Sequence, residues 1–566
     1  MNLIHELKSW LSGSRRQSVP LQYMKLGPDG STENPLMIQF FTWDAMTENK
    51  SWWRHVADEM PQLSEMGFTQ IWLPPPNKAA EKNGRGYDAY DLWDLGEFDQ
   101  KGAIGTRWGT KEELLHTCET AKYFNIDIII DAVLNHKIGA DRIEVFPAVP
   151  VDKENRLKEI GKVRDIEGWT AYDFPARGDK YSTLRWNQEH FTGFISLFSY
   201  LQDRTKSFEG LDWDHKTRTN EIYRIVGKGH KGWSKQVDQE LGNYDYLLGI
   251  DIDHRHPAVQ EDFLKWGPWI LQTTGAVGFR FDAIKHIHRP FLLSFVCVPL
   301  SDYDARTQPS RCKILDVPRI QECSQFLNFG RESKGVSSMS SSAVFNDVVV
   351  SVKAIKRYLT MFKNQTAFFD VPLHHNFHEA SKQGANFDLR TILDNTLVKS
   401  NPGYAVTFVD NHDTVSQMLE SWVGSNFKVQ AYALILLRDE GYPCVFYGDL
   451  YPHDPKCFLQ SVADQLKLLI QARRMFAYGP TQDYLEGKNC IGFVRKGDSK
   501  HNPCVVLLSN REDDGTVHSI RMNVGSVHAE SSFSSFMTDG EKVKVDQDGW
   551  GSFTCSAGGL SVWIKL

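Results

Sequence analysis

The sequence predicts an α/β fold in which eight parallel strands and their helices close into a (β/α)8 barrel, with a subdomain inserted after strand three and a C-terminal antiparallel β-sandwich domain. Three observations predict this fold. Short apolar runs that end in polar residues recur along the chain, helix-like segments lie between most of them, and alternating short strands and turns follow residue 476. Alternation of strand and helix is typical of parallel sheets, whose buried strands are continuously apolar.

Seven apolar runs are predicted to be buried strands, and helix-like segments separate them. The strand runs are 36–44, 69–76, 126–136, 276–286, 366–375, 405–414 and 442–449, and the clearest helical segments are 111–124, 259–274 and 428–440. An eighth strand would fit between 296 and 351. The count therefore favours a barrel, although a doubly wound sheet would also place its functional residues at the strand ends.

Polar and charged side chains gather where these strands end. They are Asp131, Asn135, His136, Arg280, Asp282, Asn411, His412 and Asp413. In a (β/α)8 barrel the carboxyl ends of the strands form the active-site face. The sequence therefore predicts that these side chains line one site.

The remaining stretches predict the domain organisation. The barrel is expected at 35–136 and 246–475, after an N-terminal extension at 1–34. The polar, irregular stretch 137–245 is too long for a loop, so we expect an inserted subdomain there. The stretch 476–566 carries short alternating strands, which predict the C-terminal β-sandwich.

Composition limits the class of protein. Hydrophobic residues make up 41% of the chain and charged residues 24%, the formal net charge is −7, and the pI is about 6.3. These values are typical of a globular protein and argue against a nucleic-acid or membrane partner. The first residues show no apolar targeting run, and the nine cysteines include no CxxC pair. We therefore expect free thiols, a cytoplasmic location and a monomer.

Four segments together resemble the α-amylase superfamily of glycoside hydrolases, that is, glycoside hydrolase family 13. They are DAVLNHKIGAD (131–141), GFRFDAIKH (278–286), FVDNHDT (408–414) and GYDAYDLWDLGEFDQKG (86–102). The last segment is similar to the liquefying bacterial and fungal branch. The resemblance covers about 35–290 and 352–566, and it implies an intracellular enzyme that hydrolyses α-1,4 bonds of starch, glycogen or maltooligosaccharides.

The strand end at Arg280 and Asp282 suits this chemistry. Retaining cleavage of a glycosidic bond needs one carboxylate as nucleophile and a second carboxyl group as general acid. Alternation along a strand places Arg280 and Asp282 on the same side, where the guanidinium can hold the carboxylate ionised. The resemblance implies that Asp282 is the nucleophile, whereas an isolated Arg–Asp pair can also be purely structural.

The resemblance also implies roles for other residues. Asp413 would bind sugar hydroxyls and stabilise the transition state as the second catalytic carboxylate, and His136, Arg280 and His412 would contact the same sugar. Tyr87 resembles a stacking platform, and Lys285 resembles a contact on the leaving-group side.

A calcium site is implied in the same way. Ca²⁺ takes oxygen ligands from several loops. Asn135, Asp245, Asp251 and the main-chain carbonyl of His286 match the calcium ligands of the family. Arg255 stands where the more acidic branch has a third acid, so a second metal cluster is not expected.

The general acid is missing from its place. The resemblance implies a Glu followed by an aromatic residue and Trp near position 346, but the sequence there is VFNDVVVS (344–351). The family pattern stops after residue 295 and resumes at 351. Three explanations stay open: the segment 296–351 is translated non-coding sequence, it is an insertion that supplies Glu322 or Glu332 as the acid, or the protein has become a glucan-binding pseudoenzyme. We favour the first because both boundaries are abrupt.

Two alternatives to hydrolysis remain at this point. A 4-α-glucanotransferase would use the same scaffold, and a pseudoenzyme would bind an α-glucan polysaccharide or oligosaccharide without turnover. A general acid contributes about 10²–10⁴-fold to such reactions. The chain as written is therefore expected to hydrolyse starch poorly.

Overall fold

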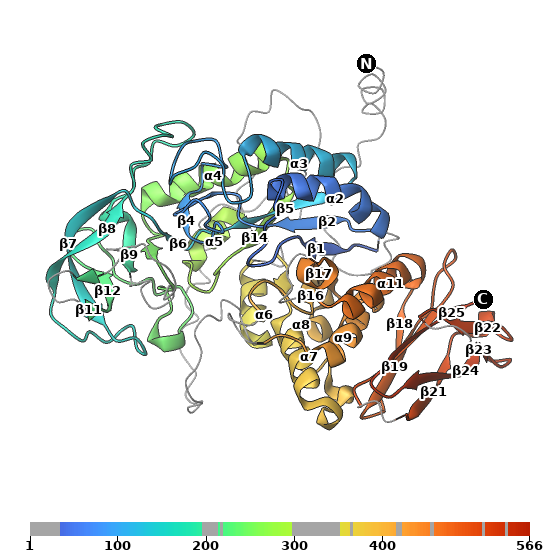
Figure 1. Cartoon of the computed structure of the whole chain (residues 1–566). Coiled ribbons are helices and arrows are strands. Elements are labelled where there is room, and N and C mark those ends of the chain that lie inside the picture. Colours follow the sequence, from blue (N-terminus) through green and yellow to red (C-terminus); the bar gives the residue numbers. More distant parts are fainter. Residues whose placement is uncertain are drawn as a thin grey trace, which may run out of the picture.

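A computed structural model describes most of the chain. It covers residues 34–194, 213–214, 219–296, 351–362, 366–414, 421–452, 458–511, 515–537 and 542–566. Figure 1 shows the parallel sheet and its helices between an inserted sheet on one side and the C-terminal strands on the other.

The seven runs predicted as buried strands all form strands of one parallel sheet. These are β1 (Met37–Gln39), β2 (Gln70–Leu73), β5 (Asp127–Ala132), β14 (Gly278–Phe281), β15 (Phe368–Phe369), β16 (Ala405–Phe408) and β17 (Tyr442–Phe446). Their order is β14-β5-β2-β1-β17-β16-β15, and every neighbouring pair is parallel. The expected eighth strand would join β14 to β15. That prediction rests on residues 297–350, which lie outside the described residues.

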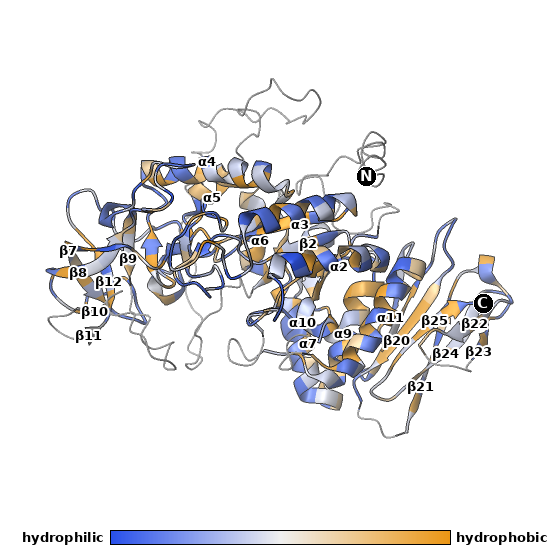
Figure 2. Cartoon of the chain, turned by 45° about the horizontal axis from the view of Figure 1, so that its top comes forward, coloured by the Kyte–Doolittle hydropathy of each residue, from blue (hydrophilic) through white to orange (hydrophobic). Residues whose placement is uncertain are grey.

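Helices follow the strands as the alternation predicts. They are α2 (Trp52–Met66), α3 (Lys111–Tyr123), α4 (Pro257–Thr274), α5 (Arg289–Val296), α6 (Val352–Met361), α7 (Val371–Gln383), α8 (Leu397–Ser400), α9 (Ser425–Leu437), α10 (Tyr447–Leu450) and α11 (Gln460–Phe476). Figure 2 shows hydrophilic and hydrophobic residues mixed along α4 and α11, as expected for helices with one buried side. By contrast, all residues of α9 from Phe427 to Leu437 are buried.

Local sequence explains where individual helices begin and end. Thr110 caps α3 and forms a capping box with Glu113, so two backbone N–H groups that lack a helical partner are satisfied. Helix α2 ends at Gly67, whose φ of 93° lies in the left-handed region that favours glycine.

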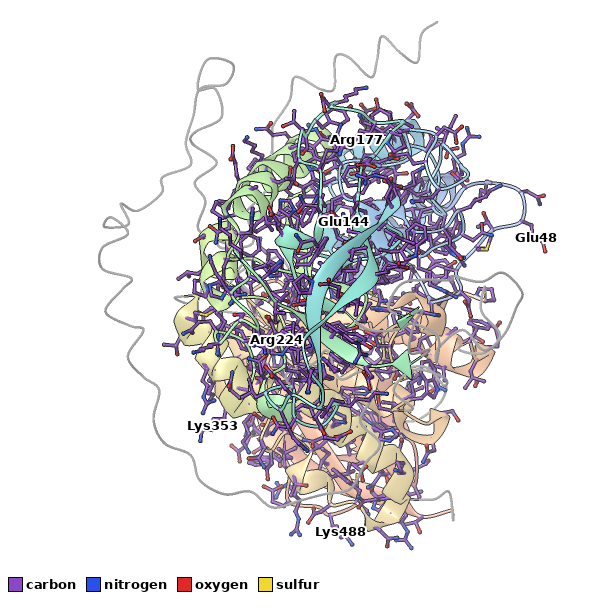
Figure 3. The ribbon with its side chains drawn as sticks, turned by 90° about the vertical axis from the view of Figure 1, so that its left-hand side faces the viewer. Glu48, Glu144, Arg177, Arg224, Lys353 and Lys488 are labelled. Atoms are coloured by element: carbon purple, nitrogen blue, oxygen red, sulfur yellow. The ribbon has the colours of Figure 1, made fainter. Side chains whose placement is uncertain are left out.

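The stretch after β5 forms an antiparallel sheet of its own. Its order is β6-β13-β9-β12-β7-β8, with β6 (His136–Lys137), β7 (Arg142–Val151), β8 (Arg164–Ala171), β9 (Phe191–Phe194), β12 (Ile222–Ile225) and β13 (Ile250–Ile252). This sheet therefore reaches Ile252, beyond residue 245. Figure 3 looks onto it, with Glu144 on β7 and Arg224 on β12.

Two short strand pairs accompany these sheets. The strands β3 (Lys78–Ala79) and β4 (Ala89–Asp91) pair in the loop after β2, and β10 (Trp213–Asp214) pairs with β11 (Thr219–Asn220). The first pair matters for the site because the loop between β3 and β4 carries Tyr87.

The C-terminal stretch forms two antiparallel sheets, which enclose an apolar cluster of their own and also contribute residues to the main core. One has the order β18-β19-β20-β25-β22-β23, and the other pairs β21 with β24. The strands are β18 (Thr481–Tyr484), β19 (Cys490–Arg495), β20 (Cys504–Ser509), β21 (Val517–Asn523), β22 (Ser532–Ser535), β23 (Lys542–Lys544), β24 (Trp550–Ser556) and β25 (Leu560–Lys565). Phe533, Phe553 and Trp563 belong to the apolar cluster of this domain. Within the described residues, no helix is long and apolar enough to cross a membrane.

Candidate active site

Arg280 joins two carboxylates at the carboxyl ends of neighbouring strands. Arg280 on β14 is the register partner of Asp131 on β5. Its Nη1 lies 3.0 Å and 3.1 Å from the two carboxylate oxygens of Asp131, and 2.8 Å from Oδ1 of Asp282. The predicted Arg280–Asp282 contact is therefore present, and Asp131 is a second partner of the same guanidinium.

Burial and charge act against each other in this cluster. Burial raises the pKa of Asp131 above its ordinary value, although Arg280 and the hydrogen bonds to Asp131 act in the opposite direction. Burial also acts to lower the pKa of Arg280, but the charges of Asp131 and Asp282 outweigh it and raise that pKa well above its ordinary value. Arg280 is thus a permanent cation between two acids.

Tyr87 and His136 belong to the same cluster. The hydroxyl of Tyr87 donates to Oδ2 of Asp131 at 2.7 Å, and Nε1 of Trp72 donates to the same oxygen at 3.0 Å. Nε2 of His136 donates to the carbonyl of Tyr87 at 2.8 Å. The loop that carries Tyr87 is therefore tied to the ends of β2 and β5.

His412 is held in one protonation state. The side-chain amide of Gln39 donates to Nδ1 of His412 at 2.8 Å, which leaves the proton of the neutral ring on Nε2. That Nε2 lies 3.3 Å from Oδ1 of Asp413. Burial and the charge of Arg280 lower the pKa of His412 well below its ordinary value. A neutral His412 therefore donates toward the carboxylate of Asp413.

Asp282 and Asp413 lie at the same rim. Both carboxylates are close enough to Arg280 and Tyr87 to shift the pKa values of those two groups. The side chain of Asp413 is 20% exposed, whereas that of Asp282 is 8% exposed. Asp282 and Asp413, which follow β14 and β16, therefore act on the same guanidinium and the same phenol.

Three rings stack beside these acids. The rings of Trp43, Tyr87 and His412 are nearly parallel, with interplanar angles of 9–14° and centroids 5.3–5.9 Å apart. The guanidinium of Arg85 lies 4.9 Å from the centre of the Trp43 ring. Trp43 and Tyr87 are partly exposed. Flat apolar faces of this kind suit the stacking of a sugar ring.

A second group of buried acids lies where the inserted sheet meets β5. The backbone N–H of Ile252 donates to the carbonyl of Asn135, and Asp251 is the register partner of His136. Neither Oδ1 nor Nδ2 of Asn135, nor Oδ1 of Asp251, has a hydrogen-bond partner among the described residues. Burial raises the pKa of Asp245 to about 8, and burial with the charge of Asp245 raises that of Asp251 well above its ordinary value.

This group of buried oxygen atoms is suited to binding a hard divalent cation. Buried polar atoms are normally satisfied, and buried carboxylates need a positive partner. The cation that acts on Asp245 and Asp251 is Arg255, whose guanidinium is already paired with Asp253 at 2.6 Å. The described residues contain no metal-type cluster of three His, Cys, Asp or Glu side chains. The set here combines two carboxylates with an amide, which is the donor chemistry that Ca²⁺ takes.

Lys285 and His286 face the inserted subdomain. Nδ1 of His286 donates to the carbonyl of Tyr244 at 2.7 Å, next to Asp245. Nζ of Lys285 lies 3.5 Å from Oε2 of Glu240 and 4.8 Å from the centre of the Tyr244 ring. His286 is thus close to the buried acids, whereas the side chain of Lys285 contacts Glu240 and Tyr244.

Comparison with known proteins identifies the family of this chain. The model of the α-amylase catalytic domain matches residues 44–238. An α-amylase from Geobacillus stearothermophilus is 37% identical over 94% of this chain and 87% of its own length. The cytoplasmic α-amylase of Escherichia coli K12 is 34% identical over 94% of this chain and 99% of its own. The chain belongs to the α-amylase family of glycoside hydrolases.

Solved structures extend the agreement to the fold of this family member. A crystal structure of an α-amylase from Geobacillus thermoleovorans, complexed with acarbose, covers 94% of this chain and 98% of its own, with a TM-score of 0.53 at 17% identity. An Anoxybacillus α-amylase covers 94% and 97%, with a TM-score of 0.54 at 15% identity. The barrel with a C-terminal β-sandwich, predicted from the sequence, is confirmed.

Some residues of the α-amylase site were not predicted from sequence. Gln39 and Trp43 lie near the end of β1, Trp72 is on β2, and all three contact residues that were predicted. Their positions at the ends of predicted strands are the signal that could have found them. Asp131 was recognised as a strand-end residue, but its contact with Arg280 was not foreseen.

Proposed function

We propose that this chain is by descent a retaining α-1,4-glucan hydrolase that acts on starch, glycogen or maltooligosaccharides. In this proposal the Asp282 carboxylate attacks the anomeric carbon and forms a glycosyl ester as the glycosidic C–O bond breaks, and the leaving oxygen takes a proton from the general acid. Water then hydrolyses the ester and restores the carboxylate. Asp413 stabilises the positively charged transition state. The observation that carries the proposal is the single guanidinium of Arg280 between Asp131 and Asp282, with Asp413 at the same rim.

The residues around the two acids would bind the sugar. Arg280 keeps Asp282 ionised, which a nucleophile requires. Nε2–H of His412 and the face of Tyr87 are proposed to contact the sugar in the cleavage position, together with His136. Lys285 would contact the leaving-group side, although its side chain contacts Glu240 and Tyr244 in this structure.

Calcium is the proposed cofactor. Asn135, Asp245, Asp251 and the carbonyl of His286 would hold it, which fits the unsatisfied atoms of Asn135 and Asp251. When bound, the ion would supply positive charge to two buried carboxylates and link the inserted sheet to β5. Its proposed role is structural, because the contacts of Asp245 and Asp251 are with Ser234, Asn243 and Thr192 of the inserted subdomain.

The general acid is not assigned to any of the described residues. The carboxylates that act on Arg280 are the aspartates Asp131, Asp282 and Asp413. The expected Glu, and the candidates Glu322 and Glu332, fall in 297–350, outside the described residues. We propose that 296–351 is translated non-coding sequence. A sequenced transcript that encodes all of this stretch would refute that explanation and favour an insertion or a pseudoenzyme.

The activity test uses a substrate whose leaving group does not need the missing general acid. A chloronitrophenyl α-maltotrioside has a leaving group that needs no protonation, so the step that releases chloronitrophenol and forms the glycosyl ester depends on the nucleophile and not on the acid. We expect this chain to release chloronitrophenol while hydrolysing starch poorly. Replacing 296–351 with a strand that bears Glu should raise starch hydrolysis by about 10²–10⁴-fold and change the aryl reaction much less.

Asp282→Asn is the decisive variant. We expect it to lower aryl-maltotrioside turnover by more than about 10³-fold, the scale on which loss of a nucleophile acts. The matched control is Asp179→Asn, an exposed carboxylate paired with Arg185, which should leave turnover unchanged. Full activity of Asp282→Asn would refute the proposal. Redistribution of glucose chains without new reducing ends would indicate a 4-α-glucanotransferase instead.

Location and assembly complete the proposal. A cytoplasmic location is proposed from the likeness to the cytoplasmic α-amylase of Escherichia coli, and fractionation of cells that produce the protein would test it. The monomeric state stays a prediction, to be checked by light scattering.

A further inference from the structure

Lys428 is a buried cation shared by two buried acids. It lies in the first turn of α9, and its side chain is 1% exposed. Nζ is 2.8 Å from Oδ2 of Asp410 and 2.9 Å from Oδ1 of Asp449. The same Nζ lies 3.0 Å from the centre of the Trp422 ring, and the hydroxyl of Tyr432 donates to Oδ2 of Asp449 at 2.6 Å. The ammonium is therefore fixed by acids from the ends of two neighbouring strands.

Asp410 links Lys428 to the turn that follows β16. Its Oδ1 accepts the hydroxyl hydrogen of Thr414 at 2.8 Å and the backbone N–H of Val423 at 3.3 Å. The carboxylate thus holds both ends of the segment 414–423. Burial raises the pKa of Asp410 to about 7, Lys428 acts to lower it, and Asp449 acts to raise it. Loss of Lys428 would therefore remove the positive charge that keeps the Asp410 carboxylate ionised and able to accept these two hydrogen bonds.

The turn itself is held by the same hydroxyl. The oxygen of Thr414 accepts the backbone N–H of Asn411 at 3.1 Å, and Oδ1 of Asn411 accepts the backbone N–H groups of Asp413 and Thr414 at 2.8 Å and 3.0 Å. Asp413 therefore belongs to a turn that the hydrogen bond from Thr414 to Asp410 joins to the buried cluster.

We propose that Lys428 is a positioning residue for the reaction: through Asp410 and Thr414 it fixes the turn that aims the carboxylate of Asp413 at the reacting sugar. This inference rests on the proposed function, and it adds a residue that touches neither substrate nor Asp413. The chain of contacts is Lys428 to Asp410, Asp410 to Thr414, and Thr414 to the backbone of the turn. A shift of about 1 Å in a group that acts in the transition state can cost about 10²-fold in rate.

The test separates positioning from stability by using two kinds of variant. Thr414→Val removes the hydroxyl and keeps the shape of the side chain, and Thr414→Ser keeps the hydroxyl. Lys428→Met removes the charge and keeps the length. The matched control is Arg495→Met, because Arg495 is equally buried and its Nη1 donates to the carbonyl of Leu437 at the other end of α9. All are assayed with chloronitrophenyl α-maltotrioside, well below each melting temperature.

The expected result is a fall in kcat with little change in KM. We expect about 10-fold for Thr414→Val and about 10²-fold for Lys428→Met, with KM within about threefold, because Asp413 acts mainly in the transition state. Thr414→Ser should keep kcat near that of the parent, and Arg495→Met should keep kcat while lowering the melting temperature.

Two results would overturn the inference in distinguishable ways. If the parent chain cleaves the substrate and Thr414→Val matches it in kcat, or Arg495→Met loses as much kcat as Lys428→Met, the proposed function stands and the positioning role is wrong. If the parent chain neither cleaves the aryl substrate nor binds maltoheptaose in calorimetry, the proposed function fails and the inference fails with it. Should Lys428→Met not fold, the Thr414→Val and Thr414→Ser pair decides alone.

Discussion

Two buried pairs of aspartates differ in how their charge is neutralised. Asp410 and Asp449 share the ammonium of Lys428 at 2.8 Å and 2.9 Å. Asp245 and Asp251 share no such group, since Arg255 is paired with Asp253 and an oxygen of Asp251 has no hydrogen-bond partner among the described residues. A buried carboxylate needs a positive partner or a proton. The first pair therefore carries its cation within the chain, and the second pair is suited to a cation from solution.

The comparison teaches that these clusters should respond to different changes. The pair held by Lys428 should depend on one side chain and be indifferent to the ions in the buffer. The pair at Asp245 and Asp251 should depend on free calcium. The predictions below use that contrast, starting from the largest expected effect.

Lys428→Met should lower the free energy of unfolding by about 3–5 kcal/mol, because it leaves two buried carboxylates without their cation. Urea unfolding at a fixed calcium concentration measures this loss. The double variant with Asp449→Asn should recover part of the stability, since it removes one of the two uncompensated charges. A loss below about 1 kcal/mol for Lys428→Met would show that the ammonium contributes little.

Chelation of calcium should lower the stability of the parent chain by about 2–3 kcal/mol when calcium was present at about 100 times its Kd. The melting temperature with and without a chelator measures the change. Asp251→Asn should lose this dependence, because it removes an oxygen donor of the proposed site. Asp449→Asn is the control and should keep it. An equal response of the parent and Asp251→Asn would contradict the assignment of the site.

A pH prediction concerns His374, a buried residue of α7 that contacts the backbone just before the turn that follows β16. Nδ1 of His374 donates to the carbonyl of Val409 at 2.6 Å, and burial lowers its pKa from 6.5 to about 3. In the unfolded chain this group takes up a proton below about pH 6.5, whereas in the folded chain it does not until about pH 3. Stability from a neutral His374 is therefore complete above pH 6.5 and is lost as pH falls toward 3.

Between about pH 7 and pH 5 this loss amounts to about 2 kcal/mol. His374→Gln cannot take up the proton, so its stability should fall less steeply over that range. Urea unfolding of both proteins at the two pH values measures the slopes. Parallel slopes would show that His374 does not contribute to the acid sensitivity.

The smallest effect is expected at an exposed ion pair. Lys265 and Glu261 lie on the solvent side of α4, with Nζ 2.6 Å from the carboxylate and both side chains more than 60% exposed. Exposed pairs contribute little because water and salt screen them. Glu261→Gln should therefore shift the melting temperature by no more than about 1 °C. A larger shift would mean that the difference in burial does not explain why this pair contributes less to stability than Lys428 and its two acids.

Much of the architecture could be predicted because it depends on local patterns. Continuous apolar runs such as 126–132 and 405–408 can be recognised as buried parallel strands from their composition alone. Alternation along β14 then placed Arg280 and Asp282 on one side, and the structure has them 2.8 Å apart. Among the described cysteines, Cys118, Cys444, Cys490, Cys504 and Cys555 form no disulfide, as expected.

Contacts that depend on strand register could not be predicted. Asp131 meets Arg280 only because β5 and β14 pair in one particular register, and nothing in either segment specifies that register. Lys428 lies in a helix whose apolar residues gave no reason to expect a buried charge, and its partners come from the ends of two strands. Likewise, β13 joins the inserted sheet by pairing with β6 and β9, a long-range choice.

The burial of helix α9 determines whether the barrel can be stable without the β-sandwich. Its residues from Phe427 to Leu437 are buried on every side, and its carbonyls at Leu436 and Leu437 accept hydrogen bonds from Arg473 and Arg495. Gln430 on the same helix donates to the carbonyl of Gly558. The β-sandwich thus completes the packing of a barrel helix, and we expect a chain cut after α11 to expose part of that helix and to lose stability.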